Sequence, residues 1–202
     1  MKLSHKALIG AGLALVLATS AFAQQAARIR GQIEKADGAM LSLKTRDGAM
    51  LNVKVADDAR VAALVKATMA DIKADSFIGI AGIPEADGSI KAYSIHIFLP
   101  AQRGVVPDRH GPWDGRANAT MTNGIVESMV TSKEGDTLMV KHKDGEKKIV
   151  VTKDTVIAAV APGNKDELKA GTPIIIMASE KQADGSVLAK TLYVGRAGPP
   201  AM

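Results

Sequence analysis

An internal duplication is the feature that most constrains what this chain folds into. Residues 86–92 read Ala-Asp-Gly-Ser-Ile-Lys-Ala, and residues 183–189 read Ala-Asp-Gly-Ser-Val-Leu-Ala. A second pair of turns, Asp47-Gly48 and Asp144-Gly145, is separated by 97 positions, as are Asp87 and Asp184. Matched turns at one spacing indicate two copies of one structural unit.

Each unit begins with segments that alternate between apolar and polar residues. In the first unit, residues 40–46 and 50–55 alternate with period two and are joined by Asp47-Gly48. This pattern predicts a β-hairpin with a tight turn. Leu41 and Leu43 share one face of the first strand, so we expect them in the core and the intervening polar side chains in solvent.

A less regular segment follows each hairpin. Asp57-Asp58 is polar and predicts a turn, and residues 61–72 are apolar enough for either a strand or a short helix. In the second unit, Pro162-Gly163 breaks the corresponding apolar run, and residues 165–168 suit one helical turn. We therefore expect a strand and then a short helical connection in both units.

Two further strands complete each unit. Residues 77–83 are apolar with two glycines, which predicts a fourth strand with a bend, a bulge or a close backbone approach. Residues 90–98 form the closing strand, with Ile95 and Ile97 facing the core and His96 on the opposite face.

The order of elements predicts an all-β protein of two tandem small β-barrels with short helical connections. Three strands, a helical connection and two strands are also the order of an OB-fold, although another small barrel or a sandwich fits the pattern. Barrel closure hides strand edges. The expected boundaries are the first barrel at 28–98, a Pro/Gly-rich linker at 99–121, the second barrel at 122–196 and a disordered tail at 197–202.

The N-terminus has the pattern of a secretory signal peptide. A basic region, Met1–Lys6, precedes the apolar residues 7–18, and Ala21-Phe-Ala23 is a small-x-small cleavage site. The apolar run is shorter than the ~20 residues that span a bilayer. We expect cleavage after Ala23 and a periplasmic or secreted protein with no membrane span in its mature form.

The signal peptide, the paired Asp-Gly hairpins and the repeated Ala-Asp-Gly-Ser-x-x-Ala motif carry a resemblance. The chain resembles secreted bacterial proteins with a repeated β-rich, OB-like domain of unknown function, over roughly residues 28–196. Some relatives of this kind are labelled as metal-transporter components. The shared motifs are turns and strands, so the resemblance implies a fold and no chemistry.

Charge and composition argue against several functions. The formal charge is +5, and Lys2 and Lys6 belong to the expected signal peptide. The remaining charges alternate in sign, and aromatic residues make up 3% of the chain, so no basic stripe or stacking platform for nucleic acid is expected. No Gly-x-Ser-x-Gly element is present. We expect no enzymatic activity.

The linker holds the candidate site. Arg109, His110, Trp113 and Asp114 lie in one short segment with the only Trp of the chain. Trp113 either pins the linker into a groove between the barrels or lines a ligand cleft there with these neighbours, since clefts between domains are common binding sites.

A divalent metal is a weaker expectation, and no other cofactor is expected. Asp108, His110 and Asp114 are the candidate ligands, because imidazole and carboxylate groups bind zinc and similar ions. The positions that correspond to His96 and His142 in the other unit are not histidines. We expect His96 and His142 to be exposed strand residues.

The sequence favours an exported, non-catalytic binding or envelope-interaction protein, whose partner is an envelope protein or a small ligand. A soluble metal- or small-ligand-binding accessory of a transporter is the first alternative. An enzyme that acts on envelope saccharides is the second.

Overall fold

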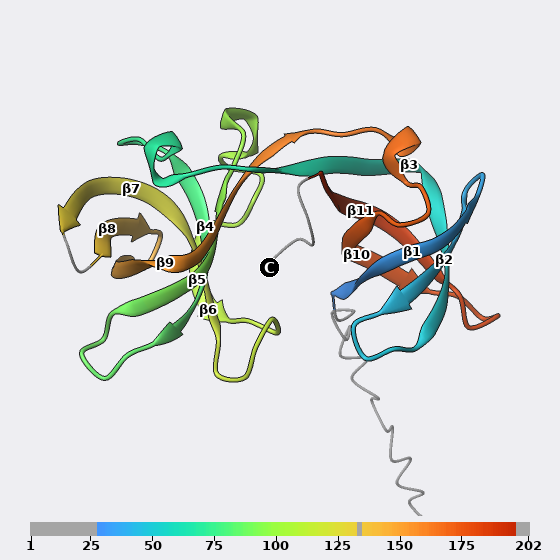
Figure 1. Cartoon of the computed structure of the whole chain (residues 1–202), viewed down its shortest axis with the longest axis horizontal. Helices are drawn as coiled ribbons and strands as arrows, with labels where there is room; N and C mark the ends of the chain where they lie inside the picture. The colour runs from blue at the N-terminus through green and yellow to red at the C-terminus, as the bar shows by residue number, and fades with distance from the viewer. Residues whose placement is uncertain (1–27, 133–134, 197–202) are drawn as a thin grey trace, which may run out of the picture.

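The computed structural model describes residues 28–132 and 135–196. The predicted signal peptide and the predicted tail lie outside these residues. The described chain is all-β, as predicted (Figure 1). Its strands are β1 (Ile29–Asp37), β2 (Met40–Thr45), β3 (Met50–Lys66), β4 (Phe77–Pro84), β5 (Ile90–Ile97), β6 (Arg109–Pro112), β7 (Thr120–Ser132), β8 (Gly135–His142), β9 (Gly145–Pro162), β10 (Pro173–Lys181) and β11 (Val187–Gly195). Three short 3-10 turns are η1 (Met69–Asp71), η2 (Pro100–Gln102) and η3 (Lys165–Glu167).

The strands close into two five-membered rings. In barrel A, β1 pairs with β2, β2 with β3, β3 with β11, β11 with β10, and β10 with β1. In barrel B, β4 pairs with β5, β5 with β9, β9 with β8, β8 with β7, and β7 with β4. Each ring has one parallel pair, β3 with β11 and β5 with β9. The predicted closed barrel is thus confirmed.

Neither barrel is made from one contiguous stretch of chain, which differs from the predicted boundaries. Barrel A takes three strands from residues 28–98 and two from residues 122–196, and barrel B takes the reverse. Each predicted unit therefore gives its fourth and fifth strands to the barrel begun by the other unit. The prediction that 28–98 and 122–196 each close a separate barrel is wrong.

The exchange follows from the length of two strands. No Gly or Pro interrupts the chain from Met50 to Lys66, so β3 continues beyond barrel A instead of turning back. The predicted turn at Asp57-Asp58 is wrong, because both residues lie within β3. β9 runs the opposite way, and residues 62–66 of β3 pair with residues 158–162 of β9 (Figure 1). This two-stranded bridge carries each chain segment from one barrel to the other.

Each barrel has its own apolar core, drawn from both halves of the chain. Leu41 and Leu43 are buried in barrel A, as predicted, and pack with residues of β10 and β11. Ile95 is fully buried in barrel B, and Ile97 packs against the same core. A third apolar cluster lies between the barrels and includes Trp113. The expected short helical connections are η1 and η3.

Glycine permits the same close strand approach in both barrels. A Cβ on Gly31 would overlap the carbonyl oxygen of Lys44, and a Cβ on Gly124 would overlap that of Lys141. Gly31 pairs with Thr45, and Gly124 directly precedes Ile125, which pairs with Lys141. The two glycines therefore take equivalent places in their rings.

Within the described residues, no helix has the length and hydropathy needed to cross a membrane.

The exchange predicts that neither half of the chain folds alone. A fragment ending at Leu99 and a fragment beginning at Val105 each lack two strands of one ring and three strands of the other. We expect each fragment to show no cooperative thermal transition by circular dichroism, and an equimolar mixture to recover the transition and elute as a 1:1 complex. A cooperative transition in either isolated fragment would contradict this.

The two close glycines predict a matched pair of destabilised variants. Gly31→Ala and Gly124→Ala should each lower the free energy of unfolding by about 1–3 kcal/mol, because the added methyl group overlaps backbone that must shift. Gly111→Ala is the control, since a Cβ there meets nothing within 4 Å. Urea denaturation of the three variants measures the difference, and equal stability of all three would count against the described strand approach.

Candidate functional site

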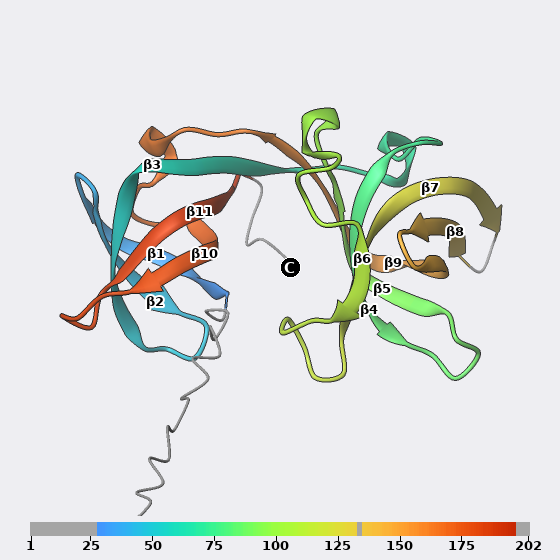
Figure 2. The same cartoon turned by 180° about the vertical axis from the view of Figure 1, so that it is seen from behind.

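The space between the two barrels is filled by the linker and by the outer faces of both barrels. Trp113 is 7% exposed and packs with Ile175 and Tyr193 of barrel A and with Ala81 and Met121 of barrel B. In Figures 1 and 2 the linker between β5 and β7 runs along the side of barrel B that faces barrel A. Trp113 therefore pins the linker between the barrels, which is one of the two roles expected for it.

Hydrogen bonds hold the linker in this position. The Trp113 backbone N–H donates to the carbonyl oxygen of Ala119 at 2.9 Å, and the Asn123 side-chain amide donates to the carbonyl of Pro107 at 2.9 Å. Gln102 donates to the Tyr193 hydroxyl at 3.1 Å. The last bond joins the linker to barrel A, so both barrels fix the linker's course.

A cleft of about 270 Å³ opens beside Trp113. It collects Phe98, Trp113 and Tyr193, which are three of the five aromatic residues in the described chain. Met121 and Met177 add apolar surface. The remaining lining residues are Arg28, Val105, Val106, Pro107, Arg109, Asn123 and Thr191. Barrel A, barrel B and the linker all contribute, so the cleft exists only in the assembled chain.

Two guanidinium groups give the cleft a positive rim. The Arg28 guanidinium stacks over the Trp113 ring, 4.0 Å from its centroid. Arg109 is exposed at the start of β6. The lining contains no Asp or Glu among the described residues. Such a cleft suits an apolar or aromatic ligand with a negative or hydrogen-bond-accepting group.

The four predicted site residues divide into two pairs. Arg109 and Trp113 line the cleft, and His110 and Asp114 do not. Asp114 instead accepts a hydrogen bond from Arg30 at 2.7 Å and lies 3.5 Å from Arg28. Burial alone would raise the pKa of Asp114, but the hydrogen bond from Arg30 and the two positive charges outweigh it and lower the pKa. Asp114 acts as an anchor for the arginines.

The three predicted metal ligands do not come together. Asp108 accepts from the backbone N–H of Lys143 at 2.9 Å, and His110 Nδ1 lies 2.8 Å from the Thr122 hydroxyl. The structure instead brings His110 to His142, with ring centroids 5.7 Å apart. Across residues 28–132 and 135–196, no group of three or more His, Asp or Glu side chains is arranged to hold a metal ion.

The two histidines expected on the surface are buried, which corrects the prediction. His96 is 1% exposed and His142 is 7% exposed. His96 lies on the outer face of barrel B, but its neighbours across the strands, Gly79 and Ala158, border the region between the barrels. An outer barrel face becomes interior once a second barrel covers it. Neither ring nitrogen of His96 has a hydrogen-bond partner in the described structure, and burial lowers its pKa to about 4.

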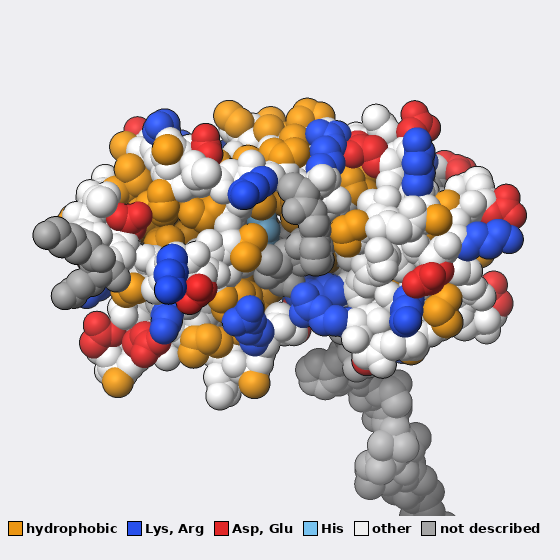
Figure 3. Space-filling model, viewed as in Figure 1, with side chains coloured by type: hydrophobic (Ala, Val, Ile, Leu, Met, Phe, Trp, Pro, Cys, Tyr) orange, Lys and Arg blue, Asp and Glu red, His pale blue; other side chains and the backbone are white. Residues whose placement is uncertain are grey.

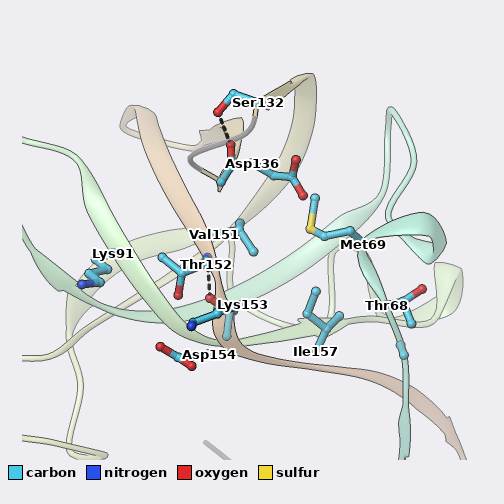
Figure 4. A pocket seen from close by; sticks show the side chains of 13 residues that line it. Thr68, Met69, Lys91, Ser132, Asp136, Val151, Thr152, Lys153, Asp154 and Ile157 are labelled. Carbon is cyan, nitrogen blue, oxygen red and sulfur yellow. Dashed lines mark hydrogen bonds between the residues drawn. The ribbon is translucent and has the colours of Figure 1, made fainter.

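A larger and more open cavity, of about 570 Å³, lies on barrel B away from the linker (Figure 4). Lys91, Asp136, Lys153 and Asp154 give it mixed charge. Figure 4 shows the carboxylates of Asp136 and Asp154 on different sides of this cavity.

Most of the cleft lining was not predicted from the sequence. Arg28, Phe98, Met177 and Tyr193 come from four separate places in the chain and line the cleft with Trp113. One signal was available in the sequence. Tyr193 in the second predicted unit corresponds to His96 in the first, so the outward-facing residue at this position differs between the units. The contact itself depends on how the barrels are placed, which no strand pattern encodes.

Comparisons with known proteins add no assignment. No family model matches the chain, and neither a curated protein nor a solved structure matches it.

Buried His96 predicts a loss of stability in mild acid. Its pKa is about 4 in the folded protein and near 6.5 when the chain is unfolded, so the unfolded state binds more protons between these values. His96 should therefore leave stability unaffected above pH 6.5 and lower the free energy of unfolding by about 3 kcal/mol as pH falls to 4. Urea denaturation from pH 4 to 7 should give a flatter profile for His96→Gln than for the native chain. Parallel profiles would refute the assignment.

Proposed function

We propose that this protein is an exported, non-catalytic binding protein that holds a small ligand in the cleft between its two barrels. The N-terminal basic, apolar and small-x-small pattern supports export with cleavage after Ala23 and a periplasmic or secreted location. The matched turns and the equivalent ring positions of the strands support an origin in two tandem OB-like units. In this proposal the units exchange their last two strands.

The composition of the cleft carries the proposal. Three aromatic side chains meet at one point of a chain with only 3% aromatic residues. They come from the residue that follows β5, from the linker and from β11, so the tertiary fold assembles them. Ligand sites are mostly apolar and aromatic, with a few polar groups that fix orientation. Asn123, Tyr193 and the two arginines supply polar groups of that kind.

The volume of the cleft and its flexible methionine side chains indicate what kind of ligand fits. About 270 Å³ lies near the lower end of the range for small-molecule sites, so a compact molecule of one or two rings fits better than a polymer. Met121 and Met177 adapt their shape to an apolar body. Trp113 offers a large ring face on which such a body packs.

Filling the cleft should abolish binding. Thr191 lies on β11 in the lining, and Thr191→Phe places a ring in the cavity. With 1-naphthoate as the probe, quenching of Trp113 fluorescence should saturate for the native chain, because Trp113 is the only Trp. We expect the affinity of Thr191→Phe for this probe to fall by about tenfold or more, the equivalent of about 1.4 kcal/mol.

Thr131→Phe is the matched control, because Thr131 is exposed on β7 outside the cleft. It should bind the probe as the native chain does. Equal binding by native protein and Thr191→Phe would remove the cleft from the proposal. Absence of saturable quenching in the native chain, tested also with neutral naphthalene-methanol, would remove the proposed function.

A further inference from the structure

A second pocket, of about 350 Å³, lies next to the first and is lined by arginines. Its walls are Arg28, Ile29, Arg30, Thr45, Arg46, Asp47, Asp114 and Gly115. We name it the arginine pocket. Arg28 is the only residue that it shares with the cleft. Figure 3 shows Lys and Arg side chains over both barrels on the face in view, some of them at the seam between the barrels.

The β1–β2 pairing brings the arginines together. Arg28 and Arg30 are two residues apart on extended backbone, so their side chains point the same way. The Arg46 N–H donates to the carbonyl oxygen of Arg30 at 3.0 Å, which sets these two residues beside each other at the end of the hairpin. The close approach at Gly31 lies at the same point. The fold therefore concentrates three positive charges at one end of barrel A.

Burial makes this concentration of charge significant. The Arg30 side chain is 9% exposed and the Arg28 side chain 20%. A charge removed from water is costly unless an opposite charge and hydrogen bonds replace the water. Asp114 serves both of these arginines, and the other carboxylate in the lining, Asp47, is hydrogen-bonded to Thr45. The described lining thus holds three guanidinium groups against two carboxylates.

One hydrogen-bond donor without a partner belongs to a residue that lines this pocket, and two more lie next to its Gly115. The Arg28 Nε, the Trp113 Nε1 and the Tyr93 hydroxyl are buried and have no partner in the described structure. The last two flank Gly115, since a Cβ there would lie 2.7 Å from the indole nitrogen and 2.6 Å from the hydroxyl. A fourth arginine, Arg116, stacks on the Tyr93 ring at 4.0 Å. Trp113 is more than nine-tenths buried, so its free N–H is a group that a bound acceptor would stabilise.

This arrangement is not repeated in barrel B. Asn123 occupies the position that corresponds to Arg30, and Lys143 the one that corresponds to Arg46. The duplicated architecture does not require arginine at these places, because barrel B closes without it. The arginines therefore call for an explanation other than ring closure.

We propose that the arginine pocket binds a phosphate group, either free or carried on a lipid headgroup. A phosphate monoester bears close to two negative charges and three acceptor oxygens, which matches several guanidinium donors better than a single carboxylate does. Arginine binds such oxygens in pairs through its planar fork. This site is separate from the proposed cleft and does not depend on it.

Titration calorimetry with inorganic phosphate on the mature chain tests the proposal. We expect saturable 1:1 binding that weakens as sodium chloride is raised, because the attraction is electrostatic. Arg46→Gln should reduce the affinity about tenfold, since Arg46 is exposed and its loss leaves the core intact. Arg46→Lys should retain part of the affinity, because it keeps the charge and loses the fork.

Arg60→Gln is the control, because Arg60 is exposed on β3 outside the pocket and its loss changes the net charge equally. Native affinity in Arg60→Gln supports the site, and equal weakening in both variants overturns it. Sedimentation with vesicles of phosphatidic acid, which carries a phosphate monoester, or of phosphatidylcholine separates the sources. Retention by the anionic vesicles that Arg46→Gln reduces identifies a lipid phosphate, whereas calorimetric binding without retention identifies a free one. If neither phosphate nor anionic vesicles bind, the proposal fails, and the naphthoate cleft remains independently testable through Thr191→Phe.

Discussion

The hydrogen-bond closure of each β-ring by strands from both halves of the chain is the constraint on which the rest of the structure depends. A five-stranded ring leaves no free edge only when its fourth and fifth strands are in place. Here those strands arrive from the other unit, along the β3–β9 bridge. Because neither ring closes without strands from the other half of the chain, the position of each barrel depends on the other. The residues between the barrels are therefore fixed in place, as core residues are.

That placement turns surface into interior. His96 lies on an outward strand face, yet it is fully buried because barrel A and the linker cover the face. Trp113 has the same origin, as a linker residue that becomes the centre of an apolar cluster. The unpartnered polar atoms of Ser94, His96 and Trp113 all lie in this covered region. Buried polar groups are nearly always hydrogen-bonded in folded proteins, so these unpaired atoms are the exceptions that the covered region has to account for.

The proposed cleft and the arginine pocket share one wall, the stack of Arg28 on Trp113. On one side the wall is aromatic and apolar, and on the other it is cationic. Asp114 ties Arg28 and Arg30 to the linker that carries Trp113. The repeated turns do not account for these groups, since Asn123 and Lys143 stand at the positions that match Arg30 and Arg46, and Trp113 lies in the unrepeated linker.

The sequence by itself determined the local structure: the Asp-Gly hairpins, the inward-facing Leu41 and Leu43, the short helical connections and the all-β class follow from turn chemistry and period-two alternation. It also singled out Arg109 and Trp113, both of which line the cleft. Only the tertiary structure decided which strands close which ring, because matched units offer nearly equivalent edges and the uninterrupted run from Met50 to Lys66 selects the distant one. It likewise decided that His96 is buried and that His110 and Asp114 lie outside the cleft. It also decided that Arg28, which is distant from the linker in the sequence, lies against Trp113. The contacts between the barrels involve strand faces that the alternation of apolar and polar residues assigns to solvent. The pattern within one strand does not show what covers such a face.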